Sequence, residues 1–208
     1  PGGQANFYLL NPNGVLIGEN AWIDVPGVFH VGAADILKFS DGSQMQADVN
    51  SSSFSAATPT SFGFLGNSLQ NNSLIAINGA KLESFGERGG IDLYANNKID
   101  IQNASFKFLK IDAAAKFGDI TINNTTFEVV PNEKNDSYVN INTAKKLNID
   151  SFNLNKGKGS SFYDFNAEEI SISSRSNIVN INSEKLGSLD NIDYISIVAR
   201  NKIKITDS

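Results

Sequence analysis

The sequence of 208 residues has no cysteine, a single histidine and no long apolar run. Without cysteine no disulfide can staple the fold, so stability has to come from burial and repetitive stacking. Because His30 is the only histidine, a metal site built from several histidines is excluded, and a catalytic triad could use no histidine other than His30. No apolar run approaches the roughly 20 residues of a membrane-spanning helix, so we expect a soluble chain.

Basic residues are also scarce. The chain has 17 Lys and Arg against 22 Asp and Glu, which gives a net charge of −5 and a pI near 4.9. A nucleic-acid-binding protein needs a basic face to neutralise phosphates, and an anionic membrane attracts the same positive charge. The sequence therefore indicates neither nucleic acid nor an anionic membrane as a partner.

The residues that are abundant suit strands and turns. Apolar residues make up 40% of the chain and charged residues 19%. The apolar set leans to Ile, Val and Phe, which pack well on a pleated surface. Asn, Ser, Thr and Gly dominate the polar set, and Asn, Ser and Thr compete with helical backbone bonds and favour turns. Composition therefore predicts an all-β chain.

Three segments share one pattern, in which two short alternating strands are separated by a polar turn that ends in lysine. The segments start at Ile91, Val139 and Ile195, which are 48 and 56 residues apart. These spacings predict two coils of roughly 20–30 residues for each repeat. The shared lysines are Lys98, Lys146 and Lys202, and further strands of the same design are expected at residues 120–122, 127–129, 170–172 and 178–181.

Alternation such as Ile-Asp-Ile places apolar side chains on one side of a strand and polar ones on the other. Because a lone hairpin of this kind is marginal in water, we expect the strands to stack in parallel coils about 4.8 Å apart that share one apolar interior. Crossover rules favour a right-handed coil. The sequence thus predicts a right-handed parallel β-helix (a solenoid). Asparagines at its turns could form hydrogen-bonded ladders, and the candidates are Asn96, Asn97, Asn123, Asn124 and Asn142.

The N-terminal part, residues 1–45, has a different pattern. Segments 7–10 and 15–17 are predicted strands. The residues between them, Asn11, Pro12, Asn13 and Gly14, suit a type I turn. We interpret this part as a hairpin, and so expect an irregular, partly antiparallel N-terminal region with extra-coil strands around residues 5–20.

The remainder of the chain is predicted to continue the same domain. A Ser/Thr-rich stretch within residues 46–70 is interpreted as a surface excursion, because strand signals resume at Phe62-Gly-Phe64. Regular coils are then expected over residues 71–208. The sequence therefore predicts a single β-helical domain over residues 1–208, as a fragment of a longer protein.

The residues from Ala5 to Gly18, with Asn-Pro-Asn-Gly between aliphatic segments, are followed by a strand that ends in Val25-Pro26-Gly27. Over about residues 5–40 this pattern resembles the secretion domain of filamentous-haemagglutinin-like exoproteins. The family's earlier Asn-Pro-Asn-Leu-type motif and its capping segment do not occur in this sequence. The Asn-rich repeats after residue 70 also differ from the family, so no receptor is carried over.

The resemblance implies a two-partner secretion substrate, namely the N-terminal module of a large adhesin- or haemagglutinin-like virulence protein. Such a module is recognised by the periplasmic domains of a cognate outer-membrane β-barrel transporter, and it then folds outside the cell and templates the coils that follow. Here Asn11, Pro12, Asn13 and Gly14 would form the recognition element. The mature protein would be secreted or held on the bacterial surface, with its activity in later regions. We therefore expect no catalytic residue, cofactor or metal site, and a host or bacterial surface receptor or glycan as a further candidate partner.

A carbohydrate-active enzyme is one alternative, because many β-helices act on polysaccharides. That chemistry needs acidic residues clustered on one face, often with arginine or lysine beside them. The acids here are scattered along the sequence, and Asp92 and Asp100 fall on outward strand positions where solvation is the simpler interpretation. The acids considered are Asp92, Asp100, Asp112, Asp119, Asp150, Glu168 and Glu169, and the arginines are Arg88, Arg175 and Arg200.

Direct binding of a receptor or glycan is a second alternative, which requires an exposed aromatic platform. Trp22 and Tyr163 are the candidates for it. The recurring lysines would either form a basic stripe or, as the favoured interpretation, place charge at the starts of strands and discourage edge association. His30 is interpreted as a strand residue with a satisfied ring rather than as a base.

Overall fold

The computed structural model describes residues 5–52, 55–63, 65, 73–84, 89–129, 137–156, 161–173 and 194–206. In this part of the chain the only helix is one turn of 3-10 helix, η1 (Val49–Ser51), and all other elements are β-strands. None of the described segments forms a helix of the length and apolar character needed to cross a membrane. The all-β prediction is confirmed.

Most strands wind as a parallel β-solenoid of about 5 turns, with three faces to a complete coil. Face 1 contains β1 (Phe7–Leu10), β4 (Val28–Ala33), β10 (Gly90–Ala95), β13 (Lys110–Ala115), β15 (Ser137–Thr143) and the first halves of β17 (Ser161–Ser173) and β18 (Tyr194–Thr206). Face 2 contains β2 (Val15–Ile17), β8 (Leu74–Asn78), β11 (Lys98–Gln102), the first halves of β14 (Ile120–Val129) and β16 (Lys146–Lys156), and the second halves of β17 and β18. Face 3 contains β3 (Trp22–Asp24), β9 (Lys81–Glu83), β12 (Ser105–Phe108) and the second halves of β14 and β16.

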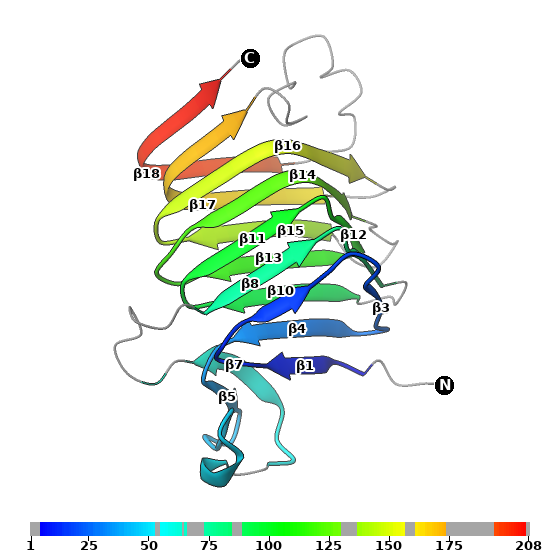
Figure 1. Ribbon diagram of the computed structural model, residues 1–208, viewed down its shortest axis with the longest axis vertical. Helices are drawn as coiled ribbons and strands as arrows, with labels where there is room; N and C mark the ends of the chain where they lie inside the picture. Colours follow the sequence, from blue (N-terminus) through cyan, green and yellow to red (C-terminus); the bar gives the residue numbers. More distant parts are fainter. Residues whose placement is uncertain are drawn as a thin grey trace.

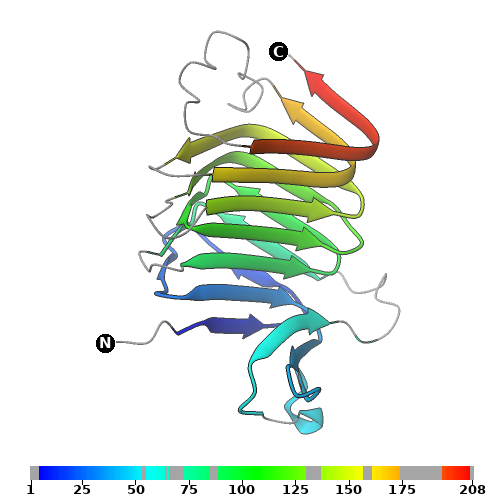
Figure 2. The same ribbon diagram turned by 180° about the vertical axis from the view of Figure 1, so that it is seen from behind.

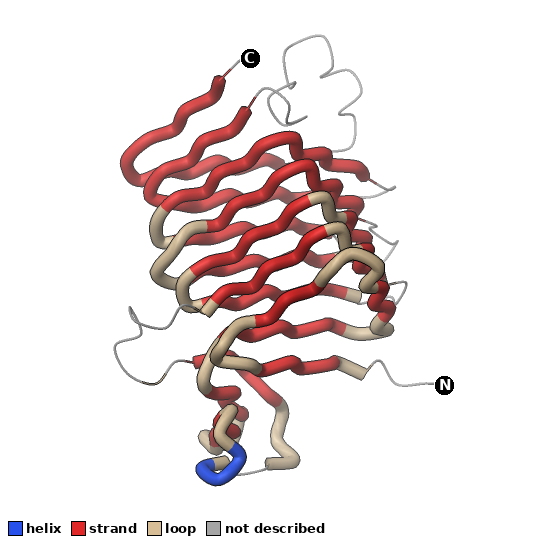
Figure 3. The backbone as a smooth tube through the Cα atoms, in the orientation of Figure 1, coloured by secondary structure: helices blue, strands red, loops and turns tan. Residues whose placement is uncertain are grey.

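The solenoid is right-handed, as predicted. In Figure 1 the chain runs to the right along the near face 2 and to the left along the far face 1 while it climbs from the N-terminal end. Figure 2 shows face 1 from its own side, with its strands stacked one above another. The tube in Figure 3 shows the strands of successive coils stacked on one another, with described turns joining face 1 to face 2. The predicted strands at 120–122, 127–129 and 170–172 lie within β14 and β17, whereas residues 178–181 are outside the described residues.

The apolar side chains of successive coils stack in register inside the solenoid. On face 1, Ile91 is opposite Ile111, and Ile111 is opposite Val139; all three are fully buried. One coil therefore lies between Ile91 and Val139, which confirms that each sequence repeat spans two coils. The backbone register continues through Tyr163 to Ile195, although the side chains of these two residues lie outside the described part.

Faces 2 and 3 contribute parallel columns to the same interior. On face 3 the rings of Phe106 and Phe127 stack with centroids 4.8 Å apart and an interplanar angle of 9°. Burying one such aliphatic or aromatic side chain stabilises a fold by about 1.5–3 kcal/mol. A continuous column of them therefore supplies the stability that disulfides would otherwise give. The column on face 2 consists of Ile75, Ile99, Ile120, Leu147 and Ile170.

Asparagine side chains form a ladder at the corner between faces 2 and 3. Asn124 Nδ2 donates to Asn103 Oδ1 at 2.9 Å, and Asn103 Nδ2 donates to Asn78 Oδ1 at 3.2 Å. Asn103 and Asn124 have positive φ angles of 51° and 44°, a conformation that asparagine tolerates. The predicted ladder is confirmed for Asn124, while its partners Asn78 and Asn103 were missed. The candidates that add no rung to this ladder are Asn96, Asn97, Asn123 and Asn142.

The recurring lysines do not form a basic stripe, because acidic residues alternate with them in register. Lys146 is opposite Glu169, and Glu169 is opposite Lys202. Lys146 Nζ lies 3.3 Å from Glu169 Oε2, and the Lys146 backbone N–H donates to Asp119 Oδ1 at 3.1 Å. Charge at the starts of the face 2 strands is therefore balanced between neighbouring coils.

The hairpin predicted around Asn-Pro-Asn-Gly is wrong. β1 pairs in parallel with β4, and β2 pairs in parallel with β8. The two strands therefore lie on faces 1 and 2 of the first coil, and the turn between them is a corner of the solenoid. A tight turn between two short strands is typical of hairpins, and its residues do not distinguish a hairpin from such a corner.

The antiparallel strands lie outside the coils and further along the chain than expected. β5 (Ile36–Phe39) pairs antiparallel with β6 (Gln44–Gln46) and with β7 (Pro59–Gly63). This small sheet projects between β4 and β8 at the N-terminal end of the solenoid (Figures 1 and 2). The antiparallel element is confirmed, but not at residues 5–20, and the excursion leaves the solenoid after Ala33 rather than at residue 46.

Candidate functional site

The predicted recognition residues form the corner between faces 1 and 2 of the first coil. The Gly14 N–H donates to the Asn11 carbonyl at 3.1 Å and closes the turn. The Asn13 N–H donates to Asn11 Oδ1 at 3.1 Å, as expected for asparagine at the first position of a turn. Pro12 presets the φ angle of the second position. Gly14 has a φ of 106°, which glycine adopts without the penalty that a Cβ brings.

The corner is attached to the second coil on both sides. The Asn11 N–H donates to the Gly32 carbonyl in β4 at 3.0 Å. A Cβ on Gly14 would lie 2.7 Å from the Leu74 carbonyl oxygen at the start of β8, so glycine lets the two backbones approach. The corner therefore helps to set the register in which β1 meets β4 and β2 meets β8.

The end of the first coil closes on the residues just before β1. Asn6 Oδ1 accepts a hydrogen bond from the Val28 N–H at 2.9 Å. A Cβ on Gly27 would lie 2.6 Å from the Ala5 carbonyl oxygen. The two sequence segments that carry the family resemblance, one at Ala5 and Asn6 and the other ending in Gly27, therefore meet in space because a coil brings its ends together.

The first coil exposes one large apolar side chain from each of its three strands. The exposed fractions are 53% for Phe7, 77% for Leu16 and 63% for Trp22. Among the described residues, β1, β2 and β3 each pair with a neighbour along one edge only. Apolar side chains beside free strand edges are typical of protein interaction surfaces.

Trp22 is held in a defined orientation on face 3. Its Nε1–H donates to Glu83 Oε1 at 2.8 Å, and Glu83 is itself buried. Lys81 Nζ lies 3.6 Å from the same oxygen. Trp22 is therefore an exposed and oriented aromatic side chain, as the platform alternative required, whereas the side chain of Tyr163 is outside the described part.

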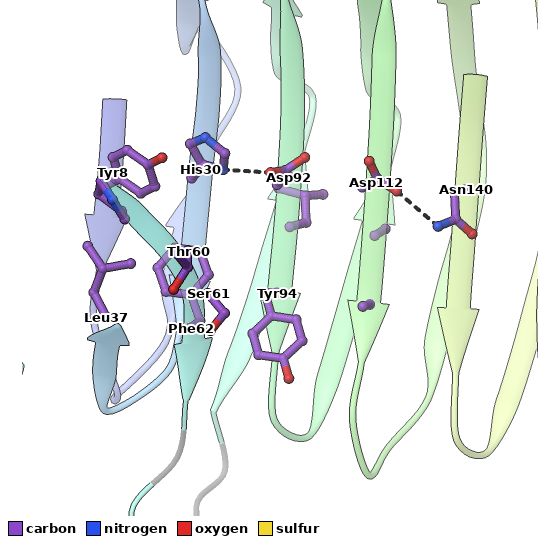
Figure 4. Close-up of a pocket in the computed structure, with 14 residues that line it drawn as sticks. Tyr8, His30, Leu37, Thr60, Ser61, Phe62, Asp92, Tyr94, Asp112 and Asn140 are labelled. Carbon is purple, nitrogen blue, oxygen red and sulfur yellow. Dashed lines mark hydrogen bonds and ion pairs between the residues drawn. The ribbon is translucent and has the colours of Figure 1, made fainter. Parts of the chain in front are cut away.

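Five residues on the outside of face 1 stand in register, one from each of five successive strands. We call Tyr8, His30, Asp92, Asp112 and Asn140 the polar row (Figure 4). The rings of Tyr8 and His30 stack with centroids 4.2 Å apart. His30 Nδ1 lies 2.5 Å from Asp92 Oδ2, and Asn140 Nδ2 donates to Asp112 Oδ1 at 2.9 Å.

The polar row corrects two interpretations from the sequence. Asp92 and Asp112 are scattered along the sequence, but they occupy register positions in adjacent coils. His30 is a strand residue, as predicted, and its Nδ1 is paired. Its Nε2, however, is buried with no hydrogen-bond partner among the described residues. The sequence does not reveal the alignment of Asp92 with Asp112 or the surroundings of His30, because the length of each coil decides which residues become neighbours.

Burial perturbs the ionisation of Asp112. Burial raises the pKa of Asp112, and the charge of Asp92 raises it further, while hydrogen bonds from Tyr138 and Asn140 act in the opposite direction. Burial also raises the pKa of Tyr138, together with the negative charge of Asp112. Asp112 is therefore a carboxylate whose ionised form is disfavoured by its surroundings.

The remaining acids and the arginines form no second cluster in the described ranges. Asp100 pairs with Lys98, at 2.9 Å between Asp100 Oδ2 and Lys98 Nζ, and Arg200 is exposed. Arg88 and Arg175 lie outside the described residues. Within those ranges no group of three or more His, Cys, Asp or Glu is arranged to hold a metal ion.

These features define a class of protein, a parallel β-helix whose first described coil carries a rigid corner and exposed apolar side chains. The family model of the TPS secretion domain matches residues 1–205. The chain therefore belongs to the TPS family of two-partner secretion domains, as the sequence resemblance implied, and it is part of a secreted exoprotein. This family is a non-enzymatic secretion module. No curated protein matches the chain, and no solved structure matches it.

The corner predicts a specific cost for adding one methyl group. We expect Gly14→Ala to lower the free energy of unfolding by about 2 kcal/mol or more, because the new Cβ is strained at positive φ and meets the Leu74 carbonyl. Gly18→Ala is the matched control, since its Cβ would meet nothing within 4 Å. Urea unfolding followed by circular dichroism measures both. Equal effects of the two substitutions would contradict the role assigned to Gly14.

The raised pKa of Asp112 predicts a pH-dependent effect of its removal. The pKa of Asp112 is higher in the folded protein than in the unfolded chain. Ionisation of Asp112 therefore lowers the stability of the folded state as the pH rises above these two pKa values. The quantity compared is the difference in the free energy of unfolding between Asp112→Asn and the parent. This difference should favour the variant more at neutral pH than at about pH 3, where the Asp112 carboxyl is largely protonated in both the folded and the unfolded state. Asp100→Asn, which loses its ion pair with Lys98, should show no such gain. A difference that is the same at both pH values would contradict the assignment.

Proposed function

We propose that the first coil is the surface by which a cognate outer-membrane transporter recognises this secretion domain. Asn11, Pro12, Asn13 and Gly14 form the centre of that surface. The observation that supports the proposal is the coincidence, in a single coil, of a rigid corner, exposed apolar side chains and strands that pair along one edge only among the described residues. The periplasmic domains of the transporter are the partner that the family resemblance implies.

The physical basis of this recognition is strand addition. A free edge offers backbone N–H and C=O groups to an incoming strand, and neighbouring side chains give specificity. In the first coil Leu16 and Trp22 lie on the two strands that follow the corner, and their exposed side chains supply such apolar contacts. Because hydrogen bonds hold the corner to the second coil, little conformational entropy is lost when a partner binds it.

We infer that the opposite end of the solenoid nucleates the coils that follow. In the part of the chain that the structure describes, β18 pairs along one edge only, with β17. Its backbone register continues the inward columns of faces 1 and 2. A stack of this kind folds by adding repeats to a preformed neighbour, so a folded secretion domain lowers the cost of ordering the next coil. Adhesion or haemagglutination would then belong to later regions of the exoprotein.

The recognition proposal is tested by changing the two asparagines of the corner together. We expect Asn11→Ala with Asn13→Ala to reduce export of the domain by about tenfold or more, as the loss of an interface hot spot does, with unchanged levels of the transporter. The measurement is the fraction of protein in the medium of cells that produce the cognate transporter. Asn123→Ala with Asn142→Ala is the control, because both of these asparagines are exposed in other coils.

A second measurement separates lost recognition from lost folding. The purified variant is compared with the parent for its circular dichroism, its urea midpoint and its binding to the isolated periplasmic domains of the transporter. A folded variant that no longer binds these domains supports the proposal. Normal export of the double variant, or normal binding by the folded variant, would refute a recognition role for the corner.

A further inference from the structure

A groove lies where the antiparallel sheet of the excursion approaches the outside of face 1. Its volume is about 350 Å³, and it is lined by the whole polar row together with residues of β7 and β10. Small-ligand sites commonly have volumes of roughly 300–1,000 Å³. Figure 4 shows β7, with Thr60, Ser61 and Phe62, crossing beside the strands that carry the polar row.

The wall of this groove is fixed to its floor by close packing. A Cβ on Gly32 would lie 2.4 Å from Phe62 Cδ1, so the missing side chain at Gly32 makes room for the Phe62 ring. The Phe62 ring also stacks on Tyr94, with centroids 6.1 Å apart and an interplanar angle of 16°. The Asp35 N–H donates to the Gly63 carbonyl at 3.0 Å and ties β7 to the base of the excursion. The excursion therefore forms one side of a preformed groove.

The lining combines aromatic rings with hydrogen-bonding groups, and it is acidic. Tyr8, Phe62 and Tyr94 supply the rings, and Asp92 and Asp112 supply two carboxylates. Among the described residues, no lysine or arginine lines the groove. A sugar presents one apolar C–H face and an edge of hydroxyl groups, which suits a site with a few convergent polar groups on an apolar wall. Lys110, which acts on Asp112, lies over the Tyr138 ring rather than in the described lining, and Asp92 contacts His30. Two carboxylates in a lining without lysine or arginine still disfavour an acidic sugar and favour one that carries an ammonium group.

We propose that this groove is a binding site for a short saccharide that contains an amino sugar. Asp112 pairs with the ammonium group, Asn140 bonds to the hydroxyl edge, and Tyr94 packs against the C–H face. Of the two carboxylates we assign Asp112 to the ammonium group, because its hydrogen-bond donors are the neutral Tyr138 and Asn140, whereas Asp92 already contacts His30. A bound cation would stabilise the ionised form of Asp112 that its surroundings disfavour. His30 also lines this groove, although its Nε2 is buried.

The residues proposed to contact the saccharide lie outside the first coil, which is the surface proposed for the transporter. Tyr94, Asp112 and Asn140 belong to β10, β13 and β15, and Tyr8 is the first-coil residue that also lines the groove. A saccharide site on the secretion domain itself would let the exported module contact a cell-surface glycan independently of later regions. The two proposals can therefore fail separately.

The test is a binding titration of the purified secretion domain with three monosaccharides. The probes are glucosamine, which is cationic, N-acetylglucosamine, which is neutral, and glucuronate, which is anionic. We expect saturation-transfer NMR and calorimetry to detect glucosamine, with weaker binding of N-acetylglucosamine and none of glucuronate. Asp112→Asn should weaken glucosamine binding by about tenfold, as the loss of a charge-assisted hydrogen bond does, whereas Asp100→Asn, outside the groove on face 2, should bind as the parent does.

A second variant keeps the proposal testable if Asp112→Asn alters the fold. Tyr94→Leu removes the ring from the groove while keeping apolar bulk, and it should weaken binding of both glucosamine and N-acetylglucosamine. Failure of the parent domain to bind glucosamine would overturn the proposal. So would equal affinity of the parent for glucuronate, or unchanged glucosamine binding in the folded Asp112→Asn and Tyr94→Leu variants.

Discussion

The structure depends on one constraint, which is that each coil must stack in register on its neighbour. A short strand such as β11 has inward isoleucines and outward polar residues, and it cannot bury its apolar side alone. Parallel pairing with β8 and β14 places Ile99 between Ile75 and Ile120 and satisfies the backbone hydrogen bonds at the same time. Stacking also aligns the outward residues, so the asparagine ladder, the alternating charges and the polar row are consequences of the same register.

Among the described strands, those of the first coil have a neighbour on one side only, and this coil is where we place the function. Phe7 continues the column of Phe29 and Ile91, yet it is half exposed because no described strand lies beyond β1. This coil therefore presents apolar side chains that a partner could cover. Its corner at Gly14 cannot shift register without moving Leu74, so the surface that we propose for the transporter is a rigid one.

Much of the fold could be predicted from the sequence, because alternation and repeat length report directly on strands and coils. The all-β class, the two coils per repeat and the turn at Asn11–Gly14 were of this kind. Pairing partners were harder, since a turn sequence does not reveal whether its strands meet each other or a later coil, and the hairpin prediction failed for that reason. The groove could not be predicted either, because it depends on contacts between residues far apart in the sequence. Asp92 and Asp112 meet because the coil between them has no insertion, and Phe62 reaches Gly32 from an excursion whose path the sequence does not encode locally.

The register itself is open to a direct measurement, because the chain has no native cysteine. Thr121 and Asn148 are opposite each other on the outside of face 2, whereas Thr121 and Asp150 are offset by two residues. Registered neighbours lie within the Cα separation of roughly 4.4–6.8 Å that a disulfide spans. Mild oxidation should therefore cross-link Thr121→Cys with Asn148→Cys and leave Thr121→Cys with Asp150→Cys largely reduced. Preferential cross-linking of the offset pair would contradict in-register stacking, and with it the account of the first coil.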